Sequence, residues 1–537
     1  MPTWTRYLPW LATLPIGLLC LWQTSWWALL PGVLFMLGVA DLLQTHHAVR
    51  RNYPLTGRLR YALEYIRPEL RQYFLESDEE SMPFSRDQRA MVYARAKQDN
   101  DKRGFGSLKN PYANQAEWLL HAMRPVHPDP ATFRVLVGQG RCAQPYAMSV
   151  FNVSGMSFGA LSGAAIHALN RGAAQGGFAH DTGEGSISPH HRAGGGDLVW
   201  QIASGYFGCR TADGHFDPEL FARQAQDPQV KMVEIKLSQG AKPGHGGVLP
   251  AAKVSPEIAR TRGVPLGQDC VSPARHSAFD GPRGLLDFLD RLRTLSGGKP
   301  VGIKLCIGRL EDWFELVQAM READSTPDFI VVDGGEGGTG AAPVEFADHV
   351  GMPLRDALHL VHTTLVGAGL RDRLRIGASG KVISGFDIVR CMALGADWCN
   401  SARGFMFAIG CIQSRSCHTD RCPTGVATQD PVRQRALVVP DKAERVFHFH
   451  TNTLKALAEL LGAAGLSHPG QVRAEQLMVR DAQGRAVCLA DTLEQLAPGA
   501  LWQDDAALAR LPAPYSTVWR RLRQGAAATA TTTTATV

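Results

Sequence analysis

The stretch Phe329-Ile-Val-Val-Asp-Gly-Gly-Glu-Gly-Gly338 decides the fold, because an apolar run is followed at once by a polar, glycine-rich turn. A short apolar run bounded by turn signals is typical of a buried strand. We expect eight such strands, at residues 149–153, 178–181, 205–208, 230–235, 301–306, 329–332, 374–377 and 397–400. Amphipathic stretches such as 161–174 and 284–295 lie between many of them. This alternation predicts an α/β fold, a (β/α)8 TIM-type barrel rather than a doubly wound sheet.

The composition excludes some classes of protein. With 537 residues, 45% hydrophobic and 20% charged, the chain is too long for one minimal domain and is not broadly disordered. A formal net charge of +6 is small for this length, so no nucleic-acid partner is expected. Of eleven cysteines, eight are scattered and three lie within residues 411–422, which favours reduced thiols and a metal site over a disulfide framework.

The N-terminus differs from the rest of the chain. From Tyr7 to Ala40 there is no charged residue, and one straight helix of that length would span about 50 Å, more than a membrane core requires. We therefore expect a transmembrane helical hairpin in residues 1–45 that turns near residues 23–25. Only Arg6 precedes the run and many arginines follow it, which predicts an inner-membrane protein whose catalytic domain is cytoplasmic. A re-entrant or interfacial hairpin and a signal peptide cleaved after residues 38–40 are the alternatives.

Composition and periodicity divide the remaining chain into four parts. We expect a helical connecting region at 46–145, the barrel with its metal loop at 146–433 and a C-terminal helical extension at 434–524. Residues 525–537 are almost entirely alanine and threonine, which predicts a disordered tail.

The segment Cys411-Ile-Gln-Ser-Arg-Ser-Cys417-His-Thr-Asp-Arg-Cys422-Pro-Thr-Gly425 is the sharpest chemical signal. Three thiolates at this spacing, with proline after the last, suit an iron–sulfur cluster. Zinc is the alternative, with His418 as a fourth ligand.

Polar residues follow several predicted strands, where a barrel builds its site. Glu184 is a candidate general acid or base, and Lys236 and Gln239 lie in a polar, glycine-rich stretch that begins at a strand end. Lys304 interrupts an apolar strand, and a buried lysine needs an anionic counterpart. Glycine-rich loops at 333–340, 378–381 and 402–404 are of the kind that holds phosphate.

In their order along the chain, these motifs resemble the FMN-binding synthase domain of glutamate synthase. The resemblance covers about residues 152–433, and its landmarks are 156–162, 182–185, 236–247, Ser272-Pro273 with His276, 301–305, 333–343 and 411–429. It implies a (β/α)8 barrel, FMN and a [3Fe–4S] cluster on Cys411, Cys417 and Cys422. It also implies that 2-oxoglutarate and ammonia form 2-iminoglutarate, which is reduced to L-glutamate.

The resemblance implies roles for individual residues as well. Glu184, Lys236 and Gln239 are expected to be catalytic, and Lys242, Arg275 and His276 to bind the substrate. The expected cofactor-binding residues are Ser154, Gly155, Met156, Thr182, Lys304, Gly335, Gly338, Ser379, Gly380, Arg403 and Gly404.

The chain also departs from the glutamate synthase pattern. It opens into the apolar segment rather than into a glutaminase domain with an N-terminal cysteine, and His245 and residues 379–381 differ from the usual residues. We therefore expect ammonia from solution or from a separate glutaminase subunit, and electrons from a ferredoxin or a reductase. One alternative is an N-methylglutamate synthase-type enzyme that uses methylamine. Another is a membrane-bound electron-transfer flavoprotein without this catalysis.

Overall fold

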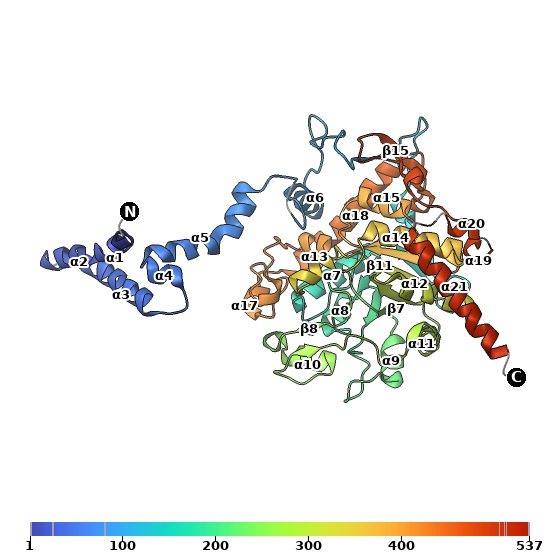
Figure 1. Ribbon diagram of the computed structural model, residues 1–537, viewed down its shortest axis with the longest axis horizontal. Helices are drawn as coiled ribbons and strands as arrows, with labels where there is room; N and C mark the ends of the chain where they lie inside the picture. The colour runs from blue at the N-terminus through green and yellow to red at the C-terminus, as the bar shows by residue number, and fades with distance from the viewer. Residues whose placement is uncertain are drawn as a thin grey trace. The chain divides into compact units, whose positions relative to one another are not determined.

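The computed structural model describes residues 3–23, 26–79, 82–503, 505–509, 511 and 513–534 (Figure 1). Its internal contacts divide the chain into two compact units, Met1–Asp87 and Gln88–Val537.

The larger unit is built around a closed barrel of eight parallel strands. These are β4 (Phe151–Val153), β5 (His180–Asp181), β6 (Leu198–Ile202), β7 (Val230–Lys236), β10 (Val301–Leu305), β11 (Phe329–Asp333), β12 (Arg375–Ser379) and β13 (Trp398–Ser401). The strands pair in chain order, and β13 pairs with β4 with Cys399 opposite Phe151, which closes the barrel. The predicted (β/α)8 barrel is confirmed.

One of the eight predicted strands is wrong. Residues 205–208 form a turn in which Tyr206 and Gly208 have φ values of 48° and 88°, in the left-handed region that a strand does not use. The third barrel strand is instead β6, whose five residues are all buried. Its sequence, Leu-Val-Trp-Gln-Ile, is apolar except for Gln201.

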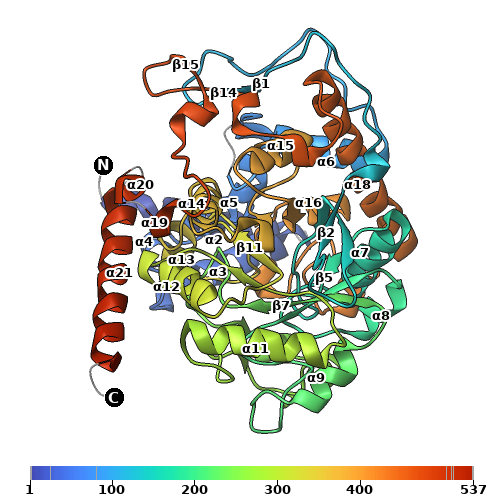
Figure 2. The same cartoon turned by 90° about the vertical axis from the view of Figure 1, so that its right-hand side faces the viewer.

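Helices cover the outside of the barrel (Figure 2). They are α7 (Gly163–Gly176), α8 (Pro189–Gly194), α9 (Pro218–Ala225), α11 (Gly281–Leu295), α12 (Leu310–Glu322), α14 (Leu354–Gly367), α15 (Gly385–Ala393) and α16 (Arg403–Ala408). Their ends follow local chemistry: the Ser162 hydroxyl accepts a hydrogen bond from Ala165 N at the start of α7, and Gly177, with φ 61°, ends it. Along α11 the leucines at 285, 286, 289 and 292 are buried, as an amphipathic helix requires.

An antiparallel hairpin of β2 (Arg134–Val137) and β3 (Tyr146–Ser149) packs against one end of the barrel. Val137 and Met148 pack into the barrel core together with the first residues of β11 and β13, Phe329 and Trp398. The hairpin therefore fills the amino-terminal end of the barrel. The carboxyl ends of the strands remain for a site.

The larger unit also contains strands and helices outside the barrel and its covering helices. The segment between β7 and β10 carries β8 (Val248–Leu249), α10 (Pro256–Arg262) and β9 (Cys270–Val271), and α13 (Val344–His349) follows β11. A small antiparallel sheet joins β1 (Glu117–Leu119), β14 (Leu477–Arg480) and β15 (Ala486–Cys488). The remaining helices are α6 (Arg86–Lys97), α17 (Pro431–Gln434), α18 (Val439–Ala463), α19 (Ala500–Gln503), α20 (Asp505–Leu508) and α21 (Ala513–Thr534). In the segment predicted to be a disordered tail, the structure has helix as far as Thr534, and residues 535–537 lie outside the described residues.

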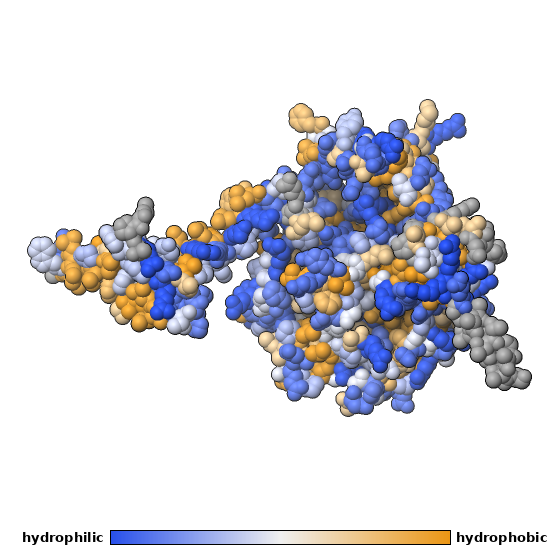
Figure 3. All heavy atoms as spheres, viewed as in Figure 1, coloured by the Kyte–Doolittle hydropathy of each residue, from blue (hydrophilic) through white to orange (hydrophobic). Residues whose placement is uncertain are grey.

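The smaller unit contains α1 (Leu8–Leu11), α2 (Thr13–Trp22), α3 (Leu29–Leu43), α4 (Ala48–Asn52) and α5 (Thr56–Leu70). Trp10 joins the two apolar arms, since its Nε1 donates to Phe35 O (3.0 Å) and the two rings stack with centroids 5.2 Å apart. Apolar side chains gather over α2 and α3 (Figure 3).

The second arm is a candidate membrane span. Among the described residues, one helix, Trp26–Leu43, has the length and apolarity for it, and a signal sequence would pass the same test. The first arm has two shorter α-helices, α1 of four residues and α2 of ten, so the predicted pair of spanning helices is supported in its second arm alone. Thr24 and Ser25 of the predicted turn lie outside the described residues.

Candidate active site

Three residues predicted to be catalytic meet at the carboxyl ends of the barrel strands. Glu184 lies just beyond β5, Lys236 ends β7 and Gln239 follows it. Lys236 Nζ donates to Glu184 Oε2 (2.8 Å) and to Gln239 Oε1 (3.1 Å). Both members of the ion pair are largely buried. The barrel thus joins residues that are 52 positions apart in the sequence.

Glu184 is surrounded by positive charge. Burial raises the pKa of its carboxyl, but the ammonium of Lys236 and the charges of Arg262 and Lys242 outweigh burial and hold the pKa below its usual range. Lys242 is itself buried, and burial lowers its pKa. Gly247 leaves room for the carboxylate, because a Cβ there would lie 2.2 Å from Glu184 Oε1. Three cations facing one carboxylate make a site that attracts a further anion.

His276 supports the end of β7. Its Nε2 lies 3.0 Å from Lys236 O and its Nδ1 lies 3.1 Å from the Tyr206 hydroxyl. Burial lowers the pKa of the imidazole, so the ring is neutral at pH 7. Arg275 is exposed. The predicted contact of His276 and Arg275 with substrate stays a prediction.

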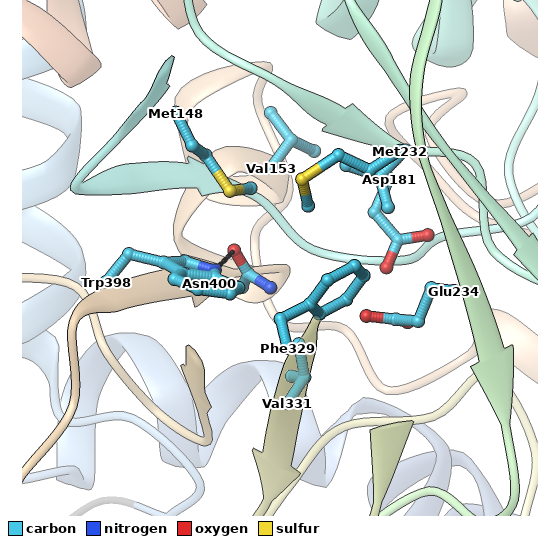
Figure 4. Close-up of a pocket in the computed structure, with 10 residues that line it drawn as sticks. Met148, Val153, Asp181, Met232, Glu234, Phe329, Val331, Trp398 and Asn400 are labelled. Atoms are coloured by element: carbon cyan, nitrogen blue, oxygen red, sulfur yellow. Dashed lines mark hydrogen bonds between the residues drawn. The ribbon is translucent and has the colours of Figure 1, made fainter. Parts of the chain in front are cut away.

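A pair of buried carboxyl groups lies deeper in the barrel, on β5 and β7. Gln201 Nε2 donates to Asp181 Oδ2 (3.1 Å) and to Glu234 Oε1 (2.7 Å). The two carboxyl groups face each other beside a small cavity that is otherwise mainly apolar (Figure 4). Burial and the charge of Asp181 raise the pKa of Glu234 to about 8, and burial also raises the pKa of Asp181. The pair therefore retains a proton at neutral pH.

Sequence analysis missed this group. Gln201 is the single polar residue of β6, and Glu234 interrupts the apolar run Met-Val-Glu-Ile within β7. Such an interruption, which also distinguishes Lys304 in β10, is the signal that the sequence offers.

Lys304 has a protein counterion. Its Nζ lies 3.7 Å from Asp333 Oδ2, and that oxygen accepts a hydrogen bond from Gly240 N (2.9 Å). Burial lowers the pKa of Lys304, but the charges of Asp333, Glu234 and Asp181 outweigh burial and raise the pKa above its usual range. Lys304 is therefore a permanent cation inside the barrel mouth. No pattern in the sequence pairs Lys304 with Asp333, because the two residues lie on different strands.

Two cations gather where the last two barrel strands end. Burial lowers the pKa of Arg403 to about 10, and burial and the nearby charge of Arg403 lower the pKa of Lys381. Arg403 Nη2 donates to Glu336 O (2.8 Å), and a Cβ at Gly338 would lie 2.8 Å from Arg403 Nε. Adjacent cations on these loops fit a phosphate group.

The other predicted cofactor residues line the strand ends nearby. Ser154 Oγ lies 3.3 Å from Ser379 Oγ, and a Cβ at Gly155 would lie 2.8 Å from both Asp181 Oδ2 and Gln201 Nε2. The Thr182 hydroxyl is fully buried and accepts from Gln201 N (3.1 Å). Met156 and Gly404 are buried, whereas Gly335 and Gly380 are partly exposed. Their contacts with a cofactor stay predictions.

The three cysteines of the motif lie on the loop after α16. In the described part of the chain, no three His, Cys, Asp or Glu side chains are arranged to hold a metal ion. The thiols nevertheless interact, since burial and the charges of Cys417 and Cys422 raise the pKa of Cys411 to about 12. Burial raises the pKa of Cys422, but the Thr424 hydroxyl and backbone N–H groups that point at its sulfur bring the pKa below its usual value. Neighbouring thiols that accept N–H hydrogen bonds are a donor set that suits an iron–sulfur cluster.

The chain is similar to several known proteins. Residues 106–467 match the family described as a conserved region in glutamate synthase. The glutamate synthase large subunit-like protein YerD of Bacillus subtilis is 38% identical over 511 residues, which are 87% of this chain and 96% of YerD. The archaeal-type NADPH glutamate synthase of Thermotoga neapolitana is 34% identical over 60% of this chain and 61% of that relative. A solved structure of a mandelate oxidase mutant with a monooxide FMN adduct covers 80% of this chain at 15% identity and a TM-score of 0.38, too remote a likeness for any inference.

Proposed function

Because this chain belongs to the glutamate synthase family, we propose that it reductively aminates 2-oxoglutarate, through 2-iminoglutarate, to L-glutamate with FMN and a [3Fe–4S] cluster. Membership of the family makes it a glutamate synthase-type oxidoreductase, and the substrates and cofactors are the proposal. One observation carries it: Lys236, Lys242 and Arg262 surround Glu184 at the barrel mouth. That excess of positive charge favours a dicarboxylate.

Substrate binding would change the state of Glu184. A substrate carboxylate on Lys236 and Lys242 competes with Glu184 for the Lys236 ammonium, which lies 2.8 Å away. When Glu184 loses this partner, its pKa rises toward the usual value and the carboxylate becomes a better proton acceptor. It can then take a proton from ammonium as the imine forms. Gln239 Oε1, which accepts from Lys236 Nζ, keeps the ammonium oriented during this exchange.

The residues at the strand ends fit FMN. Arg403 and Lys381 would hold its phosphate, and Lys304 would face the negative charge that the flavin gains on reduction. Bound FMN would supply the hydride that reduces the imine. FMN is favoured over FAD because the chain lacks the helix that a dinucleotide-binding fingerprint needs. Residues 335–340, Gly-Glu-Gly-Gly-Thr-Gly, match the letters of G-x-G-x-x-G, but no helix opens there, since α13 begins only at Val344.

Cys411, Cys417 and Cys422 would hold the [3Fe–4S] cluster, which would supply single electrons. Lys253 would help to keep the loop closed, because its Nζ donates to Cys417 O (2.8 Å) and Ala427 O (3.3 Å). A ferredoxin or a reductase would deliver the electrons, and ammonia would come from solution or a separate glutaminase.

The proposed location is the inner membrane, with residues 1–45 in the bilayer and the barrel on the cytoplasmic side. The apolar helix Trp26–Leu43 and the arginines that follow it support this location.

Anaerobic flavin reoxidation tests the reaction. Purified protein is reduced with dithionite, and the return of flavin absorbance is followed after 2-oxoglutarate and ammonium are added. We expect rapid reoxidation with both substrates, and on the order of 10²-fold slower reoxidation in Lys236→Met. Lys231→Met is the matched control, because Lys231 lies on the same strand and contacts Asp197 (3.6 Å). Reoxidation with methylamine instead of ammonium would indicate an N-methylglutamate synthase, and none with either amine would indicate an electron carrier.

A further inference from the structure

Helix α5 has one apolar face that is exposed. Leu59, Leu63, Ile66 and Leu70 are 62%, 50%, 42% and 39% exposed. At about 100° per residue these four side chains fall within an arc of roughly 60° on the helix. A continuous row of exposed aliphatic side chains marks a surface that another apolar phase covers.

Arginines line one side of this apolar face. Arg60, Arg67 and Arg71, the last directly after α5 in helical conformation, fall roughly 80–120° around the helix from Leu59. The other side carries Arg58, which pairs with Asp41, and Glu69. Residues 46–75 contain six arginines, two glutamates and no lysine or aspartate. Arg60 contacts Glu64 (2.9 Å), but both side chains are more than half exposed and such a pair is weak. Within the described part of the chain, Arg67 and Arg71 have no ion-pair partner.

The start of α5 is tied to the end of the apolar helix. Asp41, in the last turn of α3, is only 1% exposed. Its Oδ2 accepts hydrogen bonds from Arg58 Nε (2.8 Å) and Leu55 N (3.2 Å). If Trp26–Leu43 inserts into a membrane, these bonds hold the first turn of α5 at the level where the lipid headgroups begin.

We propose that α5 lies in the headgroup layer of a membrane that contains anionic lipids. Its aliphatic face enters the boundary of the acyl chains, and Arg60, Arg67 and Arg71 bind lipid phosphates. An apolar stripe with a cationic flank and tyrosines at 61, 65 and 73 is typical of an interfacial helix. The charge also selects the occupant, since a protein groove would have to supply matching carboxylates whereas an anionic bilayer presents phosphates everywhere.

This inference rests on the proposed membrane attachment, and hydrogen exchange of the full-length protein in nanodiscs tests the two separately. The protein is reconstituted with phosphatidylcholine alone or with about 30% phosphatidylglycerol, and exchange of the peptide that covers residues 59–70 is compared. We expect exchange to be at least tenfold slower with phosphatidylglycerol. The triple substitution Arg60→Ser, Arg67→Ser, Arg71→Ser should abolish this difference, since each arginine near an anionic surface contributes on the order of fivefold in binding. The matched control replaces three exposed arginines of the larger unit, Arg283, Arg309 and Arg485, with serine.

The outcomes are distinct. Slow exchange that requires both phosphatidylglycerol and the three arginines supports the proposal. Equal exchange in the two lipids overturns it, whether exchange is fast in both or slow in both, and slow exchange in both would mean that the apolar face is covered without anionic lipid. Failure of the wild-type protein to enter either nanodisc would contradict the membrane attachment itself.

Discussion

Replacing Glu234 with glutamine should make the folded protein more stable at alkaline pH. The folded-state pKa of Glu234, about 8, is raised from an ordinary value of 4.5 by burial and by Asp181. Between these two values the folded chain holds a proton that the unfolded chain releases, so stability falls as the pH rises. The slope is about 1.4 kcal/mol per pH unit, and the whole window amounts to at most on the order of 5 kcal/mol.

Glutamine preserves the geometry of the pair while removing this proton. Its carbonyl oxygen can still accept from Gln201 Nε2, now 2.7 Å from Glu234 Oε1, and its amide can donate to Asp181. Thermal unfolding followed by circular dichroism from about pH 5 to pH 9 measures the effect. The melting temperature of the wild type should fall by several degrees across this range relative to Glu234→Gln, and Glu322→Gln, at an exposed position on α12, should behave like the wild type. A wild-type slope that the Glu234 substitution leaves unchanged would refute the shared proton.

Four other changes test the remaining parts of the account. Cys417→Ser should remove the iron that metal analysis finds in the purified protein, whereas Cys142→Ser should keep it; zinc in place of iron would contradict the cluster. Lys304→Met should weaken FMN binding or slow its reduction by dithionite, because a buried cation is lost in a medium of low dielectric constant; unchanged flavin affinity and reduction rate would count against that role. Glu184→Gln should keep FMN and iron but lower turnover by about 10²–10⁴, and wild-type turnover would leave Glu184 only a structural partner of its lysine. Removing the residues before Asp41 should release the protein, with its flavin bound, from vesicles of phosphatidylcholine alone, which offer no anionic lipid to α5, and a full-length protein found in the soluble fraction would contradict the anchor.

The barrel could be predicted because its strands are short apolar runs, each followed by glycine or polar residues. The prediction places the third strand at residues 205–208 because Tyr206 and Phe207 are apolar and flanked by glycines, a pattern that strands share, but in the structure these residues form a turn. The true strand, β6, carries Gln201 in its middle, and that polar residue broke the expected pattern. Local pattern therefore does not separate a strand from a turn whose apolar side chains are equally buried, as those of Tyr206 and Phe207 are.

The site could be predicted only in its parts. Lys236 and Glu184 were both selected as strand-end residues, but their 2.8 Å contact depends on the barrel bringing β5 and β7 to the same rim. The pairing of Lys304 with Asp333 depends in the same way on the adjacent strands β10 and β11. The sequence shows which charged or polar residues interrupt an apolar strand. It does not show the partners of these residues, because the partners come from other strands.

The central claim is that this chain makes glutamate from 2-oxoglutarate and ammonia, and product analysis tests it most directly. Chemically reduced full-length protein is mixed anaerobically with 2-oxoglutarate and isotope-labelled ammonium, and the products are identified by mass spectrometry. The account predicts labelled L-glutamate in proportion to the flavin that is reoxidised, and Glu184→Gln should yield far less in the same time. Reoxidation of the flavin without labelled glutamate, or no reaction even when a glutaminase partner is added, would contradict it.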